Sequence, residues 1–503
     1  MSMRAVSFVN SRILESNADF VPQKEAMGMN RSRKCRAHLA LLAAVVLNGS
    51  TAVAEDAVVF RHVNVVPMTQ ETVLKDCDVV VRDSKIAEIG PSGKVSIPED
   101  AKVIEGMGGY LMPGLADMHI HLAEVQSHLA GGWPVDQLHM YLANGVTTVR
   151  DMHGSKYMRP FAKDVESGRR AGPAICGTAP VIWGWEDVPS GLVVQHQNAG
   201  YDTLKINSYL SERDFRLITR QAKKRGLYTV GHIPYAAGLD GVIKYGMDEL
   251  AHVEILMFEL AGLDRADPRL THYEHEFECL RESYERKYGL NPSVEEFKKA
   301  IHPEVVEIAR KVHEANIPVC TTLIVDIMIM EKNFRAAEFW ARPTCAYFTQ
   351  RIRDRWADGT DRDLKNFKGI EHWAQLVWEM CSMLFVEMDN ASVSFVFGTD
   401  SGPEWLAVAP GFSAHDELQL LVEHGMSPYE AIATATKNAG IVAQRMNSKN
   451  EFGTIEVGKR ADFILVNENP LKDVAYIKDN RGVMAAGKWY TRQELDVMVA
   501  LDK

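Results

Sequence analysis

The stretch Pro113-Gly114-Leu115-Ala116-Asp117-Met118-His119-Ile120-His121 combines a short apolar run with two histidines spaced two residues apart. Side chains alternate between the two faces of a strand, so His119 and His121 are expected to point the same way. Two imidazoles on one face suit a metal ion, although histidines at this spacing also occur by chance at polar strand ends. The rest of the chain has to decide between these two interpretations.

Short apolar runs recur from Leu115 to about Thr399, and each is followed by amphipathic sequence of helical length. This alternation is typical of a parallel sheet with crossover helices. Eight strands over roughly 285 residues predict an α/β fold, a (β/α)8 TIM barrel with insertions. A doubly wound open sheet is disfavoured because no G-x-G-x-x-G follows an early strand. The predicted strands are Leu115–His121, Val146–Asp151, Ala174–Thr178, Thr203–Ile206, Tyr228–His232, Glu249–His252, Pro318–Leu323 and Ser394–Thr399.

Two long insertions, 258–300 and 325–392, are predicted to be helical excursions over the barrel mouth. Pro428–Ala443 is predicted as a helix that begins at the N-cap Ser427. Strand-like runs occur at both ends of the chain, which predicts one small β domain contributed by both termini. These runs are Val58–Val63, Asp78–Arg82, Lys85–Ile89, Lys102–Glu105, Gly453–Val457, Ala461–Val466 and Val483–Trp489.

Further polar residues lie at the ends of the predicted barrel strands. His232, His252 and Asp400 end the fifth, sixth and eighth strands, and Lys205 lies within the fourth. Active sites of barrels gather at the carboxyl ends of the strands, so these residues are expected to converge with the two histidines of the first strand. A lysine amine buried beside metal ions should lose its proton, and a neutral amine can add carbon dioxide to form a bridging carbamate. The alternative is a lysine whose head forms a salt bridge outside the barrel.

Taken in order, these motifs resemble the metal-dependent amidohydrolase superfamily, in particular its imidazolonepropionase-like and prolidase-like branch. The resemblance covers nearly the whole chain after residue 54. It implies a barrel at 113–439 flanked by a β-sandwich domain built from 55–112 and 440–503. The matching motifs are the 113–121 stretch, Thr147-Thr148-Val149-Arg150-Asp151, Lys205, Gly231-His232, Ala251-His252, Gly398-Thr399-Asp400, residues 425–431 and residues 453–462.

The resemblance also implies a set of metal ligands, which are His119, His121, Lys205, His232, His252 and Asp400. The first two histidines and the aspartate would hold the more buried metal, and the other two histidines would hold a second one. The lysine, as its carbamate, would bridge both. The implied cofactor is one or two divalent ions, with zinc as the expected metal.

The function that follows is hydrolysis of a C–N bond, an amide such as a dipeptide or an N-acyl amino acid, by a metal-activated hydroxide. Asp400 would accept the proton of the water and pass it to the leaving amine. An ester or lactone hydrolase, a phosphotriester hydrolase, a cyclic-amide hydrolase, a deaminase and a non-catalytic binding barrel are the alternatives. Serine hydrolase and zincin readings lack support because neither G-x-S-x-G nor H-E-x-x-H occurs.

Substrate contacts are expected in the loops at the same face of the barrel. Each candidate has the alternative of simply packing its loop. The candidates are Arg150, His153, Trp185, Tyr209, Tyr235 and His415.

Composition and the N-terminus bear on partners and location. A net charge of −11 disfavours nucleic acid as a partner, and no apolar run is long enough to span a bilayer. The expected partner is the small-molecule substrate that the resemblance implies. Residues 1–54 are predicted to be an N-terminal extension and a signal peptide, the latter at about 29–54, which predicts a periplasmic or secreted protein. Disulfide pairing among the six later cysteines and assembly into a homo-oligomer are left open.

Overall fold

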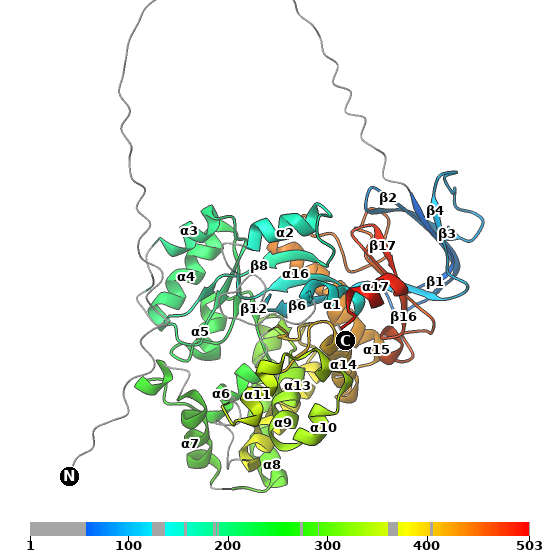
Figure 1. Cartoon of the computed structure of the whole chain (residues 1–503). Helices are drawn as coiled ribbons and strands as arrows, with labels where there is room; N and C mark the ends of the chain where they lie inside the picture. The colour runs from blue at the N-terminus through cyan, green and yellow to red at the C-terminus, as the bar shows by residue number, and fades with distance from the viewer. Residues whose placement is uncertain are drawn as a thin grey trace, which may run out of the picture. The chain divides into compact units, whose positions relative to one another are not determined.

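The computed structural model describes residues 57–122, 136–154, 158–184, 188, 191–271, 275–289, 291–360, 371–402 and 406–501. The predicted signal peptide and the extension before it lie outside the described residues, and so does Trp185. Figure 1 shows the chain with the element labels used below.

The first layer is a sheet that contains strands from both ends of the chain. Its path runs β17-β16-β15-β5-β1-β2-β3, with β4 paired to β1 (Figure 1). The central joint is the antiparallel pair of β5 and β15, in which Leu111 lies opposite Leu465. The ring of Phe60 makes edge contacts with Phe463 at 5.6 Å and with Trp489 at 5.2 Å, so both ends share one core. The strands are β1 (Val58–Val65), β2 (Leu74–Arg82), β3 (Lys85–Pro91), β4 (Lys102–Glu105), β5 (Tyr110–Pro113), β15 (Phe463–Val466), β16 (Asn480–Ala485) and β17 (Lys488–Thr491).

This sheet agrees with the predicted pairing of the two termini, with three differences. Residues 453–457 form turns rather than a strand. Residues 483–489 are a hairpin with its turn at 486–487, and Gly487 there has a φ of +83°. Strand β5 was missed because it lies directly against Gly114 and the next strand. Hydrogen bonds join all eight strands into one sheet, so a sandwich and the domain limits stay predictions.

The second layer consists of two parallel sheets, of order β6-β7-β8 and β14-β13-β12-β11-β10-β9. The prediction of an α/β fold with parallel sheets is confirmed. All eight predicted strands are present at their predicted positions, several of them one to four residues shorter. An additional short strand, β9, continues β8 after a break at Ala179 and Pro180. The strands are β6 (Leu115–Ile120), β7 (Val146–Asp151), β8 (Ala174–Thr178), β9 (Val181–Ile182), β10 (Thr203–Ile206), β11 (Tyr228–Gly231), β12 (Glu249–Leu250), β13 (Val319–Cys320) and β14 (Phe395–Val396).

Backbone hydrogen bonds also cross the edges of the two parallel sheets. The Met118 N–H donates to the Phe397 carbonyl at 2.9 Å, so the end of β14 lies directly beside β6. One step further along, a parallel bridge pairs Ile120 with Ser401. At the opposite edge the chain itself links the sheets, because β8 of the first continues through Ala179 and Pro180 into β9 of the second, where the Lys205 N–H of β10 donates to the Pro180 carbonyl at 3.1 Å. The carboxyl ends of β6, β10 and β14 are therefore brought to one region.

Helices follow the strands and fill the insertions. Helix α4 is a clear case, because Ser211 accepts a hydrogen bond from Asp214 N at its start and Gly226, in the left-handed region, ends it. The predicted helix at 428–443 begins with a capping box of Ser427 and Glu430 and continues through a π turn to Met446. The helices after strands are α1 (Gln137–Ala143), α2 (Met158–Glu166), α3 (Leu192–Asn198), α4 (Glu212–Arg225), α5 (Gly238–Tyr245), α14 (Phe412–Glu423), α15 (Pro428–Ala433), α16 (Ala439–Met446) and α17 (Arg492–Met498).

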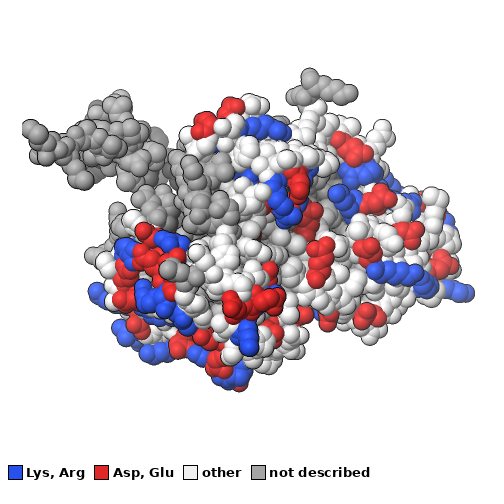
Figure 2. All heavy atoms as spheres, turned by 90° about the horizontal axis from the view of Figure 1, so that it is seen from below, with Lys and Arg blue, Asp and Glu red and all other residues white. Residues whose placement is uncertain are grey.

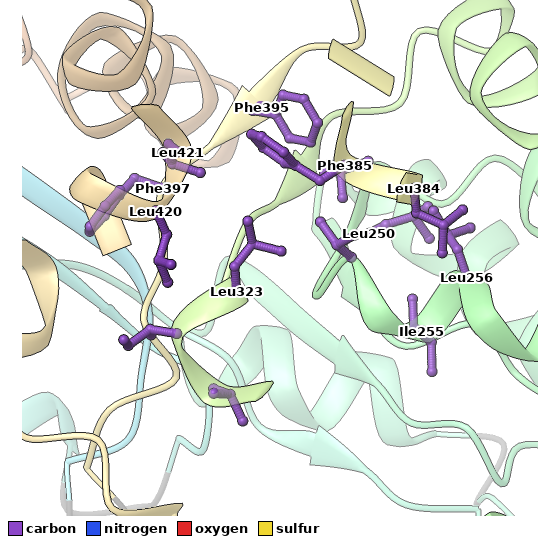
Figure 3. Packing of buried hydrophobic residues seen from close by; sticks show 14 of the residues in the cluster. Leu250, Ile255, Leu256, Leu323, Leu384, Phe385, Phe395, Phe397, Leu420 and Leu421 are labelled. Carbon is purple, nitrogen blue, oxygen red and sulfur yellow. The ribbon is translucent and has the colours of Figure 1, made fainter. Parts of the chain in front are cut away.

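The described parts of the two insertions are helical, as predicted. Their helices are α6 (Met257–Ala261), α7 (Glu276–Tyr288), α8 (Val294–Glu314), α9 (Leu323–Phe334), α10 (Ala336–Trp340), α11 (Gln350–Ala357) and α13 (Glu371–Asn390). Figure 3 shows how α9, α13 and α14 pack onto β12 and β14 through Leu250, Leu323, Phe385, Phe395 and Leu421. The rings of Phe385 and Phe395 lie 4.9 Å apart. This core holds the strand ends that carry the site.

The charge of the surface, the character of the helices and the state of the cysteines bear on partners, membranes and disulfides. Figure 2 shows acidic and basic side chains interspersed over the face that it presents. Within the described ranges, no helix has both the length and the apolar character that crossing a bilayer requires. The six cysteines in the described part of the chain are buried and free: Cys77, Cys176, Cys279, Cys320, Cys345 and Cys381.

Candidate functional site

The two histidines of the first predicted motif meet the aspartate that follows β14. The Asp400 Oδ1 atom lies 2.9 Å from His121 Nε2 and 3.3 Å from His119 Nε2. Burial alone would raise the pKa of Asp400, but the hydrogen bond from His121 and the nearby positive charges outweigh it and hold the pKa below its usual value. The carboxylate is therefore ionised at neutral pH. One potential ligand atom from each of His119, His252 and Asp400 lies within 4.8 Å of the others.

Lys205 joins this group from strand β10. Its Nζ lies 3.0 Å from His119 Nε2, and the residue is only 5% exposed. Burial lowers the pKa of this amine, although Asp400 and Asp151 oppose that effect. The lysine head therefore lies inside the site rather than in a salt bridge outside, and burial shifts its pKa toward easier loss of the proton.

His232 and His252 complete the group from the ends of β11 and β12. The Nδ1 atom of His232 lies 3.0 Å from Ser208 Oγ, and that of His252 lies 3.0 Å from Thr322 Oγ1. With Nδ1 engaged by a hydroxyl, Nε2 is the nitrogen left for a metal, as in many histidine metal ligands. Burial lowers the pKa of His232 far below its usual value and that of His252 to about 3, so both are neutral, as ligands must be.

The six predicted ligand residues are thus in one place, and their chemistry fits a divalent cation. Four imidazoles and one carboxylate offer nitrogen and oxygen donors of the kind that zinc and similar ions bind. Rings of neighbouring histidines approach closely, with centroids 4.3 Å apart for His119 and His252 and 5.1 Å apart for His232 and His252. Metal binding itself stays a prediction.

Unusual backbone conformations mark the same strand ends. His252, Thr322 and Asp400, which follow β12, β13 and β14, have φ values of +78°, +52° and +54°. Non-glycine residues adopt this region at a cost and cluster at functional sites. The conformation of Thr322 is supported by Glu417 of α14. The buried carboxylate of Glu417 accepts hydrogen bonds from the Leu323 and Ile324 N–H groups, which directly follow Thr322, at 3.1 and 2.7 Å. The first turn of α9, and with it Thr322, is thereby held against His252.

His153 lies beside the group, as its prediction as a substrate contact requires. Its ring centroid is 5.8 Å from that of His121 and 6.0 Å from that of Trp183. Burial, followed by the charges of His121 and Lys205, lowers its pKa to about 4. A neutral imidazole therefore stands at the edge of the site.

Tyr209 and Tyr235 lie beyond Lys205 and His232, but their hydroxyls already have a partner. Both donate to one oxygen of Glu276, at 2.8 and 2.9 Å, and their rings meet edge to face at 6.0 Å. Glu276 begins the inserted helix α7, within a charged stretch that reads as a solvated helix face. No local signal in the sequence indicates this partnership.

Arg150, a predicted substrate contact, is buried within the fold. Its side chain is fully buried and pairs with Glu249, with Nη1 donating to Oε2 at 2.8 Å and Nη2 donating to Oε1. Its Nε donates to the Met118 carbonyl at 2.6 Å, next to His119. Burial opposes its positive charge, but Glu249 outweighs burial and raises its pKa. Arg150 lies within strand β7, as the predicted strand Val146–Asp151 places it.

His415 is also placed differently from a residue in a substrate loop. It lies in the first turn of α14 and is 9% exposed. Burial, and then the charge of Lys478, lowers its pKa to about 4. Among the described residues, no hydrogen bond or ring contact joins it to the metal-site group. Trp185, the remaining candidate, lies outside the described residues.

Comparisons with known proteins find similarity to amidohydrolases. A sequence model of the Amidohydrolase family matches residues 383–490. Ochratoxinase of Aspergillus niger is 36% identical over 95 residues, which are 19% of this chain and 18% of that protein. Dihydroorotase of Mycobacterium tuberculosis is 49% identical over 47 residues, 9% of this chain and 10% of that protein, so the chain matches only a small part of these relatives. A putative prolidase from Bifidobacterium longum has the same fold, with a TM-score of 0.58 and 22% identity over 88% of this chain and 98% of that one.

Proposed function

We propose, from the premise that this chain belongs to the amidohydrolase superfamily, that it is a metal-dependent enzyme hydrolysing an amide C–N bond. One observation carries the proposal: four histidines, a lysine and an aspartate from five strand ends lie within contact of one another. The likeness to proteins named ochratoxinase and prolidase supports the amide class. The substrate we propose is a dipeptide or an N-acyl amino acid.

The architecture that goes with this function is a closed (β/α)8 barrel at 113–439 with a β domain from 55–112 and 440–503. The backbone bond and bridge between β6 and the segment after β14, together with the continuation of β8 into β9, support closure. We also propose the prolidase-like branch of the superfamily, and export after cleavage near Ala54. An N-terminal read of secreted protein should begin near Glu55, and an intact Met1 would count against cleavage.

The proposed ligands divide into two groups. His119, His121 and Asp400 would hold one divalent ion, and His232 and His252 would hold a second. Lys205 lies 3.0 Å from His119 and has a lowered pKa, which suits a bridging role. Its neutral amine would add to the carbon of carbon dioxide and release a proton, which leaves an anionic carbamate.

When bound, a divalent ion at such a site acidifies water and polarises the substrate carbonyl. Asp400 is the residue that would move the proton, since its low pKa keeps it ready to accept one from the attacking water. The protonated Asp400 would then donate to the nitrogen of the leaving amine as the C–N bond breaks. His153, neutral and beside His121, would contact the bound amide.

A metal and activity screen tests this function. Purified protein should contain one or two divalent ions per chain, and a library of dipeptides and N-acyl amino acids should include a substrate. Turnover of aryl esters, lactones, phosphotriesters or cyclic amides alone would replace the proposed substrate class with that one. A metal-free preparation with full activity would overturn the mechanism.

The bridging lysine needs its own variant. Lys205→Ala should lose most activity and bound metal, because the site then lacks its bridging anion. Lys311→Ala is the matched control, since that lysine pairs with Asp240 on the surface. Equal activity and metal content in Lys205→Ala and Lys311→Ala would refute the bridging role.

A further inference from the structure

A chain of buried hydroxyl groups lies directly behind the aspartate of the metal site. The three hydroxyl groups belong to Thr399, Ser401 and Tyr141, and they lead to the carboxyl group of Asp117. All four residues are 0% exposed. They come from β6, from the segment after β14, and from α1. No motif considered in the sequence predicts this grouping, because its members are up to 284 positions apart in the chain.

The row of hydrogen-bonded hydroxyl groups ends at the carboxylate of Asp117. This carboxylate accepts from the Thr399 hydroxyl at 2.6 Å, from the Thr399 N–H at 3.1 Å and from the His119 N–H at 3.3 Å. Even with these three donors, burial raises its pKa to about 7, so the group is costly to keep in a core. Asp117 therefore binds both the histidine motif and the residue that precedes Asp400.

The remaining hydroxyls extend the chain in one direction. A hydroxyl has a single proton, so when Asp117 is ionised, Thr399 donates to it and must accept from its other neighbour. That neighbour is the Ser401 hydroxyl, 2.8 Å away, and Ser401 in turn lies 2.7 Å from the Tyr141 hydroxyl. The order of donation is then Tyr141 to Ser401 to Thr399 to Asp117.

Backbone bonds tie the same segment to the histidine motif. The Asp400 N–H donates to the His119 carbonyl at 2.7 Å, and the His121 N–H donates to the Ser401 carbonyl at 2.8 Å. Asp400 itself has a φ of +54°, a conformation that its neighbours must hold. The hydroxyl chain and these two bonds together set the direction in which the Asp400 carboxylate leaves the backbone.

We propose that Asp117 and Thr399 are positioning residues that hold Asp400 against His119 and His121 and so set the affinity of the site for a divalent metal. This inference rests on the proposed function, because it assumes that Asp400 and the two histidines bind metal. Neither residue is one of the proposed ligands, and both Asp117 oxygens are bound to Thr399. Residues that orient metal ligands typically change metal affinity or activity by about 10–100-fold when they are replaced.

The decisive comparison is Thr399→Val against Thr399→Ser. Valine keeps the shape of threonine and removes its hydroxyl, whereas serine keeps the hydroxyl. Zinc affinity of the metal-free proteins, measured by competition with a chromophoric chelator, should fall about 10–100-fold in Thr399→Val and stay within about threefold in Thr399→Ser. With a substrate in hand, Thr399→Val should lower kcat more than it raises KM.

Tyr141→Phe keeps the test open if Thr399→Val fails to fold. This variant removes only the first donor of the chain, and a zinc affinity lowered about threefold or more supports the proposal. Equal zinc affinity in wild type and Thr399→Val would overturn it, and so would an equal loss in Thr399→Ser and Thr399→Val. A wild-type protein that binds no divalent ion would instead refute the proposed function, and the inference with it.

Discussion

The buried pair of Arg150 and Glu249 makes the sharpest stability prediction. Both side chains are fully buried, and two hydrogen bonds join the guanidinium to the carboxylate. Replacing Arg150 with Met leaves the Glu249 charge with the Tyr228 hydroxyl, 3.1 Å away, as its side-chain donor among the described residues. The same change leaves the Met118 carbonyl without the Arg150 Nε donor.

Breaking a buried ion pair from one side costs about 3–5 kcal/mol, because an uncompensated charge stays in the core. Native domains have about 5–15 kcal/mol in total, so Arg150→Met should remove a large part of the stability. Glu249→Leu should cost a similar amount. The double variant, with both charges replaced by apolar groups, should lie within about 2 kcal/mol of wild type.

Urea unfolding followed by circular dichroism measures these four proteins. Arg310→Met serves as the surface control, since Arg310 pairs with Glu307 and Glu314 while half exposed and should lose less than about 1 kcal/mol. Single variants that each lose less than about 1 kcal/mol, or a double variant that loses the sum of both, would refute the reasoning. A stable Arg150→Met protein with a raised KM would instead support the prediction that Arg150 contacts substrate.

Three further predictions concern pH, backbone and metal. Burial lowers the pKa of His415 to about 4, below its unfolded value of about 6.5, so the unfolded chain binds more protons between these pH values. Wild type should therefore lose about 3 kcal/mol more stability than His415→Leu when unfolding is measured at pH 7 and again at pH 4, and parallel curves would contradict this. Gly402→Ala should destabilise the protein and lower zinc binding, because the added Cβ would lie 1.8 Å from the His121 carbonyl oxygen. The control is Gly226→Ala, whose added Cβ would have no atom within 4 Å. That variant should lose only about 1 kcal/mol of stability and bind zinc normally. Removing metal with a chelator should abolish activity and lower Tm, and added zinc should restore both; an unchanged Tm would argue against a metal bound to the folded state.

The strands and the six candidate ligands could be predicted because their signals are local. An apolar run of four to eight residues indicates a buried parallel strand wherever it occurs, and the alternation of such runs with helices indicates their parallel order. Parallel strands end at one edge of a sheet, so His232 and His252, each at the end of a run, were expected beside His119. The ring distances from His252 to His119 and to His232 agree with that expectation, and so do the lowered pKa values of His232 and His252.

The partners of several polar residues could not be predicted in this way. Arg150 ends a strand and looks like a loop residue, yet its partner Glu249 is 99 positions away. Glu276 looks like one charge of a solvated helix, yet it accepts hydrogen bonds from two tyrosines on other elements. Hydrogen bonds between residues so far apart in the sequence depend on how the helices and strands pack together. A single sequence does not show which distant residues that packing brings into contact.

By itself, then, the sequence determined which residues form the strands, which ligand types stand at their ends, and that strand-forming runs at both termini belong together. The tertiary structure alone decided that Arg150 is sealed against Glu249, and that Asp117 and Thr399 stand behind Asp400. The physical reason is range. Periodicity and strand length are set by neighbours a few residues apart, whereas the cost of burying a charge or a hydroxyl depends on groups that only folding brings within 3 Å.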